Sequence, residues 1–266
     1  MNESFVRIWT LAHIVWREMI RRKDLYVLLI LLAALMIYLL GMDFFGSKSA
    51  VRYIAESGLL LSWLFSWILA ITIAARQLPN EERRGTIFPL LAKPISRAEL
   101  IVGKWLGAWI AACVGTGFFY ICVLGAVFLR GGELSLTTFA QGYILHTSLL
   151  AILSSIALCL STRLNSDAAS TLSCVVSIVC FLMIPRVPEM LAYAEGISAV
   201  FVKGLYWGLP HFEFFDMRRR IVHGWELAPW NAFMGSIAYA VLWTAMFLCL
   251  AWLGYRRKLF NRELIG

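Results

Sequence analysis

Six long apolar runs constrain the fold of this chain more than any other feature of its sequence. An α-helix needs roughly 17–25 predominantly apolar residues to cross a hydrocarbon layer of ~30 Å, and each run approaches or exceeds that length. The runs are continuous rather than alternating, which disfavours a transmembrane β-barrel. The sequence therefore predicts an all-α integral membrane protein with six transmembrane helices. The predicted spans are residues 25–41, 57–75, 101–129, 139–160, 168–185 and 231–254.

The composition agrees with this class. The 266 residues are 61% hydrophobic and 15% charged, whereas soluble domains are about 45–50% apolar and about 25% charged. No cleavable signal peptide is evident, because the first apolar run begins only at Leu25 and no small-residue cleavage site follows it. All 6 cysteines fall inside or at the ends of predicted spans, so no disulfide framework is expected. Without repeats or a Pro-rich linker, residues 1–266 are expected to form a single domain.

The distribution of Lys and Arg predicts that both termini are cytoplasmic. Residues 1–24, 76–104, 161–167 and 255–266 together hold 16 Lys and Arg against 8 Asp and Glu, and the remaining segments hold 8 of each. Short cytoplasmic segments carry an excess of Lys and Arg, so we expect an N-in, C-in protein of the inner (cytoplasmic) membrane. The basic excess then indicates contact with anionic lipid rather than with nucleic acid.

Residues 1–24 are expected to contain an amphipathic elbow helix rather than a span. Apolar residues recur at helical spacing on one face, and basic residues occupy the other. A basic, Trp-rich helix of this kind lies in the plane of the membrane interface, so the chain should bend near Lys23 to enter the first span. Membrane anchoring and contact with a partner both remain open as its role. The apolar face comprises Phe5, Ile8, Trp9, Ala12, Val15, Trp16, Met19 and Ile20.

The third span has a helix-start signal before the predicted membrane boundary. Ser96 and Glu99 form an S-x-x-E capping box. A helix from Arg97 to Leu129 would be ~50 Å long at 1.5 Å per residue, so its first turns should protrude into the cytoplasm. Small residues at every fourth position allow another helix to approach closely, either within the subunit or at a dimer seam. These positions are Gly103, Gly107, Ala111 and Gly115.

The outer segment 186–230 is too long to be a plain loop. Its stretches EMLAYAEGISAVFVKGLYWG and FEFFDMRRRIVHG predict short interfacial helices that cap the outer face. The segment also contains the best candidates for metal ligands, but their spacing matches no recurrent ligand pattern, and a solvated face is favoured. In the spans, His146 is the one deeply placed ionisable residue, and a hydrogen-bonded histidine is favoured over a proton relay. The metal candidates are His211, Glu213, Asp216 and His223.

Recognised catalytic motifs are missing from the sequence. The one Gly-Lys pair, Gly103-Lys104, is followed by Trp105 and opens a membrane helix, so it cannot form a phosphate-binding P-loop. Zinc motifs, G-x-S-x-G and H-E-x-x-H are also absent. We therefore expect no catalytic, cofactor or metal site in this chain.

The charged segment 76–104 reads RQLPNEERRGTIFPLLAKPISRAELIVGK and is longer than a simple turn between two spans. Pro79 is expected to break the extension of the second span, and Asn80 to cap a short turn with acidic residues at its positive end. Residues 86–91 then form a short apolar element, and Pro94 redirects the chain into the third helix. This pattern predicts a docking element, although a loop that folds back onto the bilayer remains the alternative.

This segment closely resembles the type-2 ABC transporter permease family, and the six-span architecture with its elbow helix is similar across almost the whole chain. Gly85 stands where many relatives have Arg. The resemblance rests on an acidic residue, a G-T pair, a leucine pair, K-P, S-R and finally G-K followed by G. The matching positions are Glu82, Gly85, Thr86, Leu90, Leu91, Lys93, Pro94, Ser96, Arg97, Gly103, Lys104 and Gly107.

The resemblance implies a permease subunit that forms a homodimer or heterodimer with a second permease and works with two copies of a cytoplasmic ABC ATPase. ATP and Mg would be bound by that ATPase and not by this chain. The family places a coupling helix between the second and third spans, which inserts into the ATPase. The coupling residues implied here are Glu81, Glu82, Arg83, Gly85, Thr86, Ile87, Phe88, Leu90, Leu91, Pro94 and Arg97.

Three functions are compatible with the sequence. The first is a permease of an exporter or flippase with an amphiphilic substrate. The second is a non-transporting mechanotransmission subunit that acts on an envelope partner through residues 186–230. The third, a membrane-embedded enzyme, is disfavoured because no catalytic set is visible.

Overall fold

The computed structural model describes residues 3–21, 23–41, 47–83, 96–191, 193 and 196–256, and every regular element in these ranges is a helix. The long helices are α1 (Glu3–Arg21), α2 (Asp24–Gly41), α3 (Ser47–Ala75), α6 (Arg97–Leu129), α7 (Leu136–Ser161), α8 (Ser166–Leu182) and α12 (Trp230–Arg256). The short ones are α4 (Gln77–Arg83), η1 (Ile184–Arg186), α9 (Val187–Leu191), α10 (Ile197–Gly208), η2 (Phe212–Phe215) and α11 (Arg218–His223).

The helices confirm a multi-pass, all-helical membrane protein. Within the described residues, five stretches are long and apolar enough to cross a membrane, and a sixth candidate is the pair α1 and α2, which is bent by 55°. The predicted first span, α2, therefore qualifies only together with α1, and the interfacial position of α1 and the N-in orientation stay predictions. The five stretches are Val51–Arg83, Arg97–Leu129, Leu136–Ser161, Ser166–Leu191 and Trp230–Arg256.

The predicted start of α6 is confirmed, and α8 also begins with a side-chain cap. The Glu99 backbone N–H donates to Ser96 Oγ at 3.2 Å, and the Ser96 N–H donates to Glu99 Oε2 at 2.7 Å. Asn165 Oδ1 accepts from the Ala168 N–H at 2.9 Å at the start of α8. These side chains satisfy N–H groups that have no partner within the first turn of a helix.

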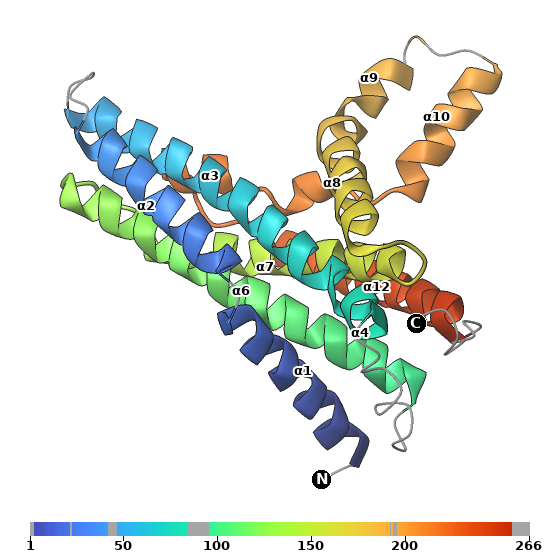
Figure 1. Ribbon diagram of the computed structural model, residues 1–266. Helices are drawn as coiled ribbons and strands as arrows, with labels where there is room; N and C mark the ends of the chain where they lie inside the picture. Colours follow the sequence, from blue (N-terminus) through green and yellow to red (C-terminus); the bar gives the residue numbers. More distant parts are fainter. Residues whose placement is uncertain are drawn as a thin grey trace.

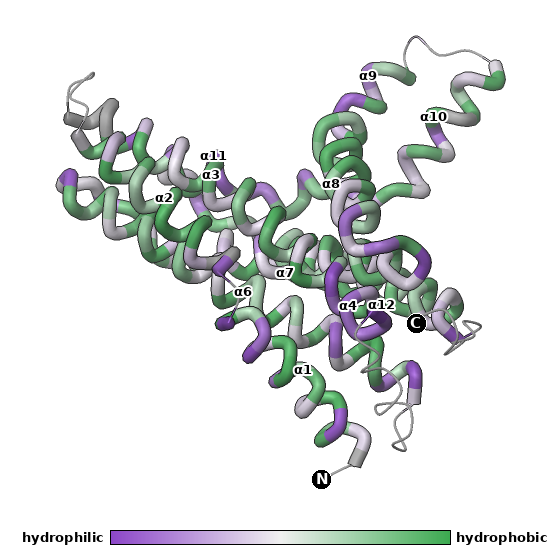
Figure 2. The backbone as a smooth tube through the Cα atoms, in the orientation of Figure 1, coloured by the Kyte–Doolittle hydropathy of each residue, from purple (hydrophilic) through white to green (hydrophobic). Residues whose placement is uncertain are grey.

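The centre of the molecule is built from α3, α6 and α7. Figure 1 shows α2, α3 and α6 side by side, with α8 inclined away from them and α9 and α10 beyond it. Helix α7 contacts α3, α6 and α12, and its residues 149–153 are all buried. By contrast, α12 leaves apolar side chains such as Val241 and Leu242 exposed. Figure 2 shows apolar residues along the long helices and polar ones around α4 and the turn between α7 and α8.

Helix α1 packs closely against the first half of α6 because two glycines leave room for it. A Cβ atom on Gly103 would lie 2.8 Å from Leu11 Cβ, and one on Gly107 would lie 2.7 Å from Val15 Cβ and 2.8 Å from the Ala12 carbonyl oxygen. Real Cβ atoms do not approach neighbours so closely. These members of the small-residue stripe therefore face a helix of the same subunit.

The contact with α6 divides the apolar face that the sequence assigns to α1. Val15 and Met19 are 0% and 4% exposed, whereas Phe5 and Trp9 are 57% and 55% exposed. The remaining stripe positions, Ala111 and Gly115, are also buried. Part of α1 thus serves protein packing, and the rest is available to a membrane or a partner.

Substitution of Gly107 by Ala should destabilise the full chain by about 1–3 kcal/mol, because the added methyl group would collide with the α1 backbone. Gly125 lies in the same helix with nothing within 4 Å of its Cβ position, so Gly125→Ala is the matched control. It should leave stability unchanged or raise it by up to about 1 kcal/mol. Thermal unfolding of both variants in detergent measures the difference, and equal unfolding temperatures would contradict this packing.

Candidate functional site

The described borders of the charged segment are α4 and the first turn of α6. Helix α4 follows α3 after one turn residue, Arg76, and Gln77, Leu78 and Pro79 are buried. The second span's helix does break here, but at Arg76, and Pro79 lies in the first turn of the new helix α4. The expectation that Asn80 caps a turn is wrong, because Asn80 lies inside α4. The physical reason is that proline in the first turn of a helix loses no intrahelical hydrogen bond, so α4 continues through Pro79.

The predicted coupling residues divide into two groups. Glu81, Glu82 and Arg83 form the last turn of α4, and Arg97 begins α6. The others lie outside the described residues, so their role as a docking element stays a prediction. They are Gly85, Thr86, Ile87, Phe88, Leu90, Leu91 and Pro94.

A buried ion pair joins α4 to α6. Lys104 is 1% exposed, and its Nζ pairs with Glu81 Oε1. A lysine is almost never fully buried unless it is paired, so this contact fixes the position of α4 on α6. In the sequence, Lys104 stands out as part of a Gly-Lys pair. The signal for this ion pair is that Lys104 is a single cation beyond the first turns of an otherwise apolar helix, and such a buried cation needs an acidic partner.

Arg97 joins α6 to the end of α12. Its Nη1 donates to the carbonyl oxygens of Tyr255 at 2.8 Å and Arg256 at 2.6 Å. Carbonyls in the last turn of a helix have no intrahelical partner and carry partial negative charge, so the guanidinium suits this position. The predicted contact of Arg97 with an ATPase stays a prediction, and the contacts observed here are internal.

Two weaker contacts complete this end of the molecule. Arg83 Nη2 donates to Ser166 Oγ at 3.4 Å, which links α4 to α8, and Arg7 Nη1 lies 3.9 Å from Glu99 Oε2, which links α1 to α6. Exposed pairs of this kind contribute little singly. Together with Glu81–Lys104 and the Arg97 contacts, they form what we call the terminal clamp, which ties both ends of the charged segment to α1, α8 and α12.

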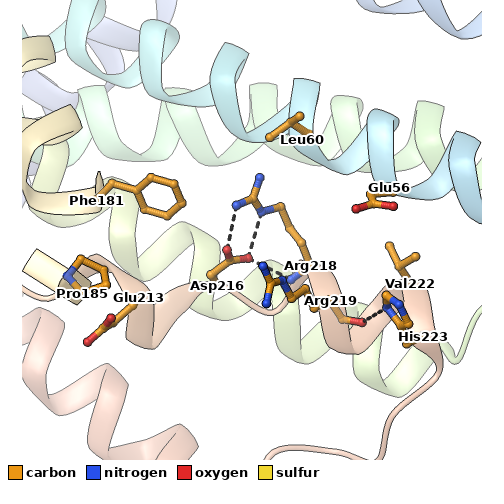
Figure 3. A pocket seen from close by; sticks show the side chains of 10 residues that line it. All are labelled: Glu56, Leu60, Phe181, Pro185, Glu213, Asp216, Arg218, Arg219, Val222 and His223. Carbon is orange, nitrogen blue, oxygen red and sulfur yellow. Dashed lines mark hydrogen bonds and ion pairs between the residues drawn. The ribbon is translucent and has the colours of Figure 1, made fainter. Parts of the chain in front are cut away.

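A cavity of about 560 Å³ lies at the opposite end, between α3, the end of α8 and the η2–α11 region (Figure 3). Its inner wall is formed by Arg218, whose Nε and Nη2 donate to the Asp216 carboxylate at 2.9 and 2.7 Å. The guanidinium carbon also lies 4.6 Å from the centre of the Trp63 ring. Cation–π contact and a bidentate carboxylate together fix the arginine in one position.

Beneath Arg218 lies a buried polar layer. The Trp63 ring stacks on His146 with centroids 4.8 Å apart. Ser66 Oγ lies 2.8 Å from His146 Nε2, and Tyr120 OH lies 3.1 Å from Nδ1. The expectation that His146 is hydrogen-bonded is confirmed. Arg218 of the outer segment thus contacts Trp63 of α3, which in turn stacks on His146 at the centre of the bundle.

The expectation that residues 212–224 form an interfacial cap on the outer face is only partly correct. Phe212 and Phe215 are both 0% exposed, so η2 inserts into the bundle instead of lying on its surface. Burying two phenylalanine side chains stabilises the fold more than leaving them exposed on the surface would.

Three of the four candidate metal ligands are engaged in other contacts. Asp216 pairs with Arg218, His223 Nδ1 bonds the Arg219 carbonyl at 3.0 Å, and the His211 ring lies 3.1 Å from Tyr239 OH. Burial lowers the pKa of His211. In the part of the chain that the structure describes, no three His, Cys, Asp or Glu residues are grouped to hold a metal ion.

The fold and these contacts define a helical, multi-pass membrane subunit. The family described as ABC-2 family transporter protein matches residues 9–262, which is nearly the whole chain. The protein belongs to this family, whose members are transmembrane subunits of ABC transporters that act with an ABC ATPase subunit. A comparison with curated proteins gave no match.

Substitution of Lys104 by Ala should destabilise the chain by about 3–5 kcal/mol, because it leaves the Glu81 carboxylate without its buried partner. The double variant Glu81→Gln/Lys104→Met should recover much of this loss, since neither side chain then carries a charge. Lys203→Ala, which removes an exposed lysine of α10, is the control and should be neutral. Thermal unfolding in detergent measures all three, and a Lys104→Ala variant as stable as the control would contradict the assignment.

Proposed function

We propose that this chain is the permease subunit of an ATP-driven exporter or flippase, and that its segment 76–104 receives the movement of a separate ATPase subunit. The observation that carries the proposal is the terminal clamp. Both described borders of the segment are bonded to other helices: α4 to α6 and α8, and the start of α6 to α1 and α12. A displacement of the segment would therefore reach five helices at once.

Helix α6 is the element suited to carry such a displacement across the membrane. It runs unbroken for 33 residues from Arg97 to Leu129. At its far end, Arg130 Nη2 donates to the Leu40 carbonyl at the end of α2. Packed helices shift as rigid bodies between discrete arrangements, so movement at the clamp would change the opposite end of the bundle.

The partner in this proposal is a cytoplasmic ABC ATPase present in two copies, which binds ATP and Mg, while two permease chains form a homodimer or heterodimer. The apolar residues Ile87, Phe88, Leu90 and Leu91 would fill a cleft of the ATPase, with Glu82 and Arg97 near its rim. A buried apolar anchor surrounded by charged residues is the usual arrangement at the centre of an interface.

A mechanotransmission subunit is the second candidate, and one observation favours it. The α9–α10 region presents large apolar side chains: Tyr193 is 90% exposed, Ile197 90% and Trp207 79%. Exposed apolar surface beyond the bundle is typical of an interaction site, here for an envelope partner. Movement of a labelled amphiphile by the reconstituted complex would favour the exporter, and ATP-dependent change in a bound envelope protein without such movement would favour the second candidate.

Phe88→Ala and Leu91→Ala should weaken binding of the ATPase by about 2 kcal/mol or more if these side chains are anchors, and Glu82→Lys should place an unpaired charge at the rim. We expect loss of ATPase co-purification, or ATP hydrolysis that no longer responds to substrate. Ile197→Ala, at the other end of the molecule, is the control. The chain purified alone should hydrolyse no ATP. If all three variants match wild type in both assays, this segment is not the coupling element.

A further inference from the structure

We propose that the cavity between α3, α8 and α11 binds the headgroup of a zwitterionic amphiphile that carries an ammonium group and a phosphate. The inference concerns binding to this chain, and it holds whether or not the ATPase coupling proposed above is correct. It rests on the charges around the cavity and on the apolar surface that leads away from it.

Charges of both signs surround the cavity without neutralising one another. Glu56 from α3, Glu213 from η2 and Arg219 from α11 line it (Figure 3), and none of them forms an ion pair with any residue in the described ranges. Arg218 and Asp216 are already engaged in their bidentate pair, so they form a fixed wall. Three charged groups thus remain to contact a ligand.

This combination selects the charge type of the ligand. Figure 3 draws Glu56 and Glu213 at opposite ends of the cavity, so either carboxylate can accept hydrogen bonds from an ammonium group, and the Arg219 guanidinium can donate to a phosphate. An anionic headgroup would be repelled by two carboxylates. A purely cationic headgroup would leave the Arg219 guanidinium without a negatively charged group to bind. A zwitterion satisfies both, and a cavity of about 560 Å³ falls within the usual range of small-molecule sites.

An apolar chain attached to such a headgroup can pack against an exposed apolar surface of α3. Leu60, which lines the cavity, is followed at four-residue intervals by Leu64 and Ile68, and these side chains are 54%, 56% and 38% exposed. Residues spaced by four lie on the same face of a helix. An exposed apolar strip therefore extends along α3 from the cavity into the predicted span, and Phe181 and Pro185 add an apolar wall.

Native mass spectrometry of the full chain in mild detergent tests the inference. The probes are dihexanoyl phosphatidylethanolamine, its anionic phosphatidylglycerol counterpart and glycerophosphoethanolamine, which has the headgroup alone. We expect the ethanolamine lipid to bind at least about tenfold more tightly than the glycerol lipid, since an ion pair or charge-assisted hydrogen bond is lost. Glu56→Gln and Arg219→Gln should each weaken it by a similar factor. Equal binding of the two lipids would overturn the proposal.

Two controls separate this site from general effects. Glu189→Gln removes an exposed carboxylate of α9 outside the cavity and should leave binding unchanged; an equal loss in this variant would overturn the proposal. Leu64→Ser should weaken binding of the lipid but not of the headgroup alone. If it changes the oligomeric state while lipid binding is unaffected, the strip covers a second copy of the chain, and the proposed path for the apolar chain is wrong.

The same lipid has two possible sources, a resident lipid of the outer leaflet or the transported molecule. In the complex with its ATPase, hydrolysis that is stimulated by the ethanolamine lipid and loses this response in Glu56→Gln would identify cargo. Binding without stimulation would identify a resident lipid. Both results support the site, whereas absence of binding to the wild-type chain refutes it.

Discussion

A lysine enclosed by apolar helices needs a carboxylate beside it, and this requirement at Lys104 determines how the end of the molecule that carries α4 is arranged. Its partner, Glu81, lies on the other side of residues 84–95 in the chain. Removing two charges from water costs several kcal/mol per ion unless they pair well, so α4 cannot leave α6 without a large penalty. The two borders of residues 84–95 are consequently held at a fixed separation, and any movement imposed on that segment is passed to the helices.

The glycines of α6 extend this arrangement to the N-terminal helix. Because Gly103 and Gly107 let α1 approach the α6 backbone, the helix predicted to lie on the membrane surface is also a packed part of the bundle. At the opposite end, Arg218 holds the outer segment against Trp63 of α3, as Lys104 holds α4 against α6. The two ends are therefore both anchored by cations, one through a carboxylate and one through a carboxylate and an aromatic ring.

Much of the fold was predictable from the sequence because its causes are local. Apolar run lengths predicted the five stretches that can cross a membrane alone, and the Ser96 capping box predicted the start of α6. The span predicted at 57–75 lies within a longer helix, because α3 begins at Ser47 and also includes the polar residues Arg52 and Glu56. What sequence patterns left open depended on contacts between distant residues. The partner of Lys104 could not be chosen from sequence spacing, because three acidic residues lie in the same charged segment.

The central claim is that residues 84–95 contact an ATPase rather than the membrane. A photo-crosslinking amino acid placed at position 88 of the full chain in cells tests it most directly, with position 197 as the control at the opposite end. We expect a covalent adduct with an ABC ATPase subunit from position 88 and none from position 197. Adducts with lipid alone at position 88 would show that the segment folds back onto the bilayer and would contradict the account.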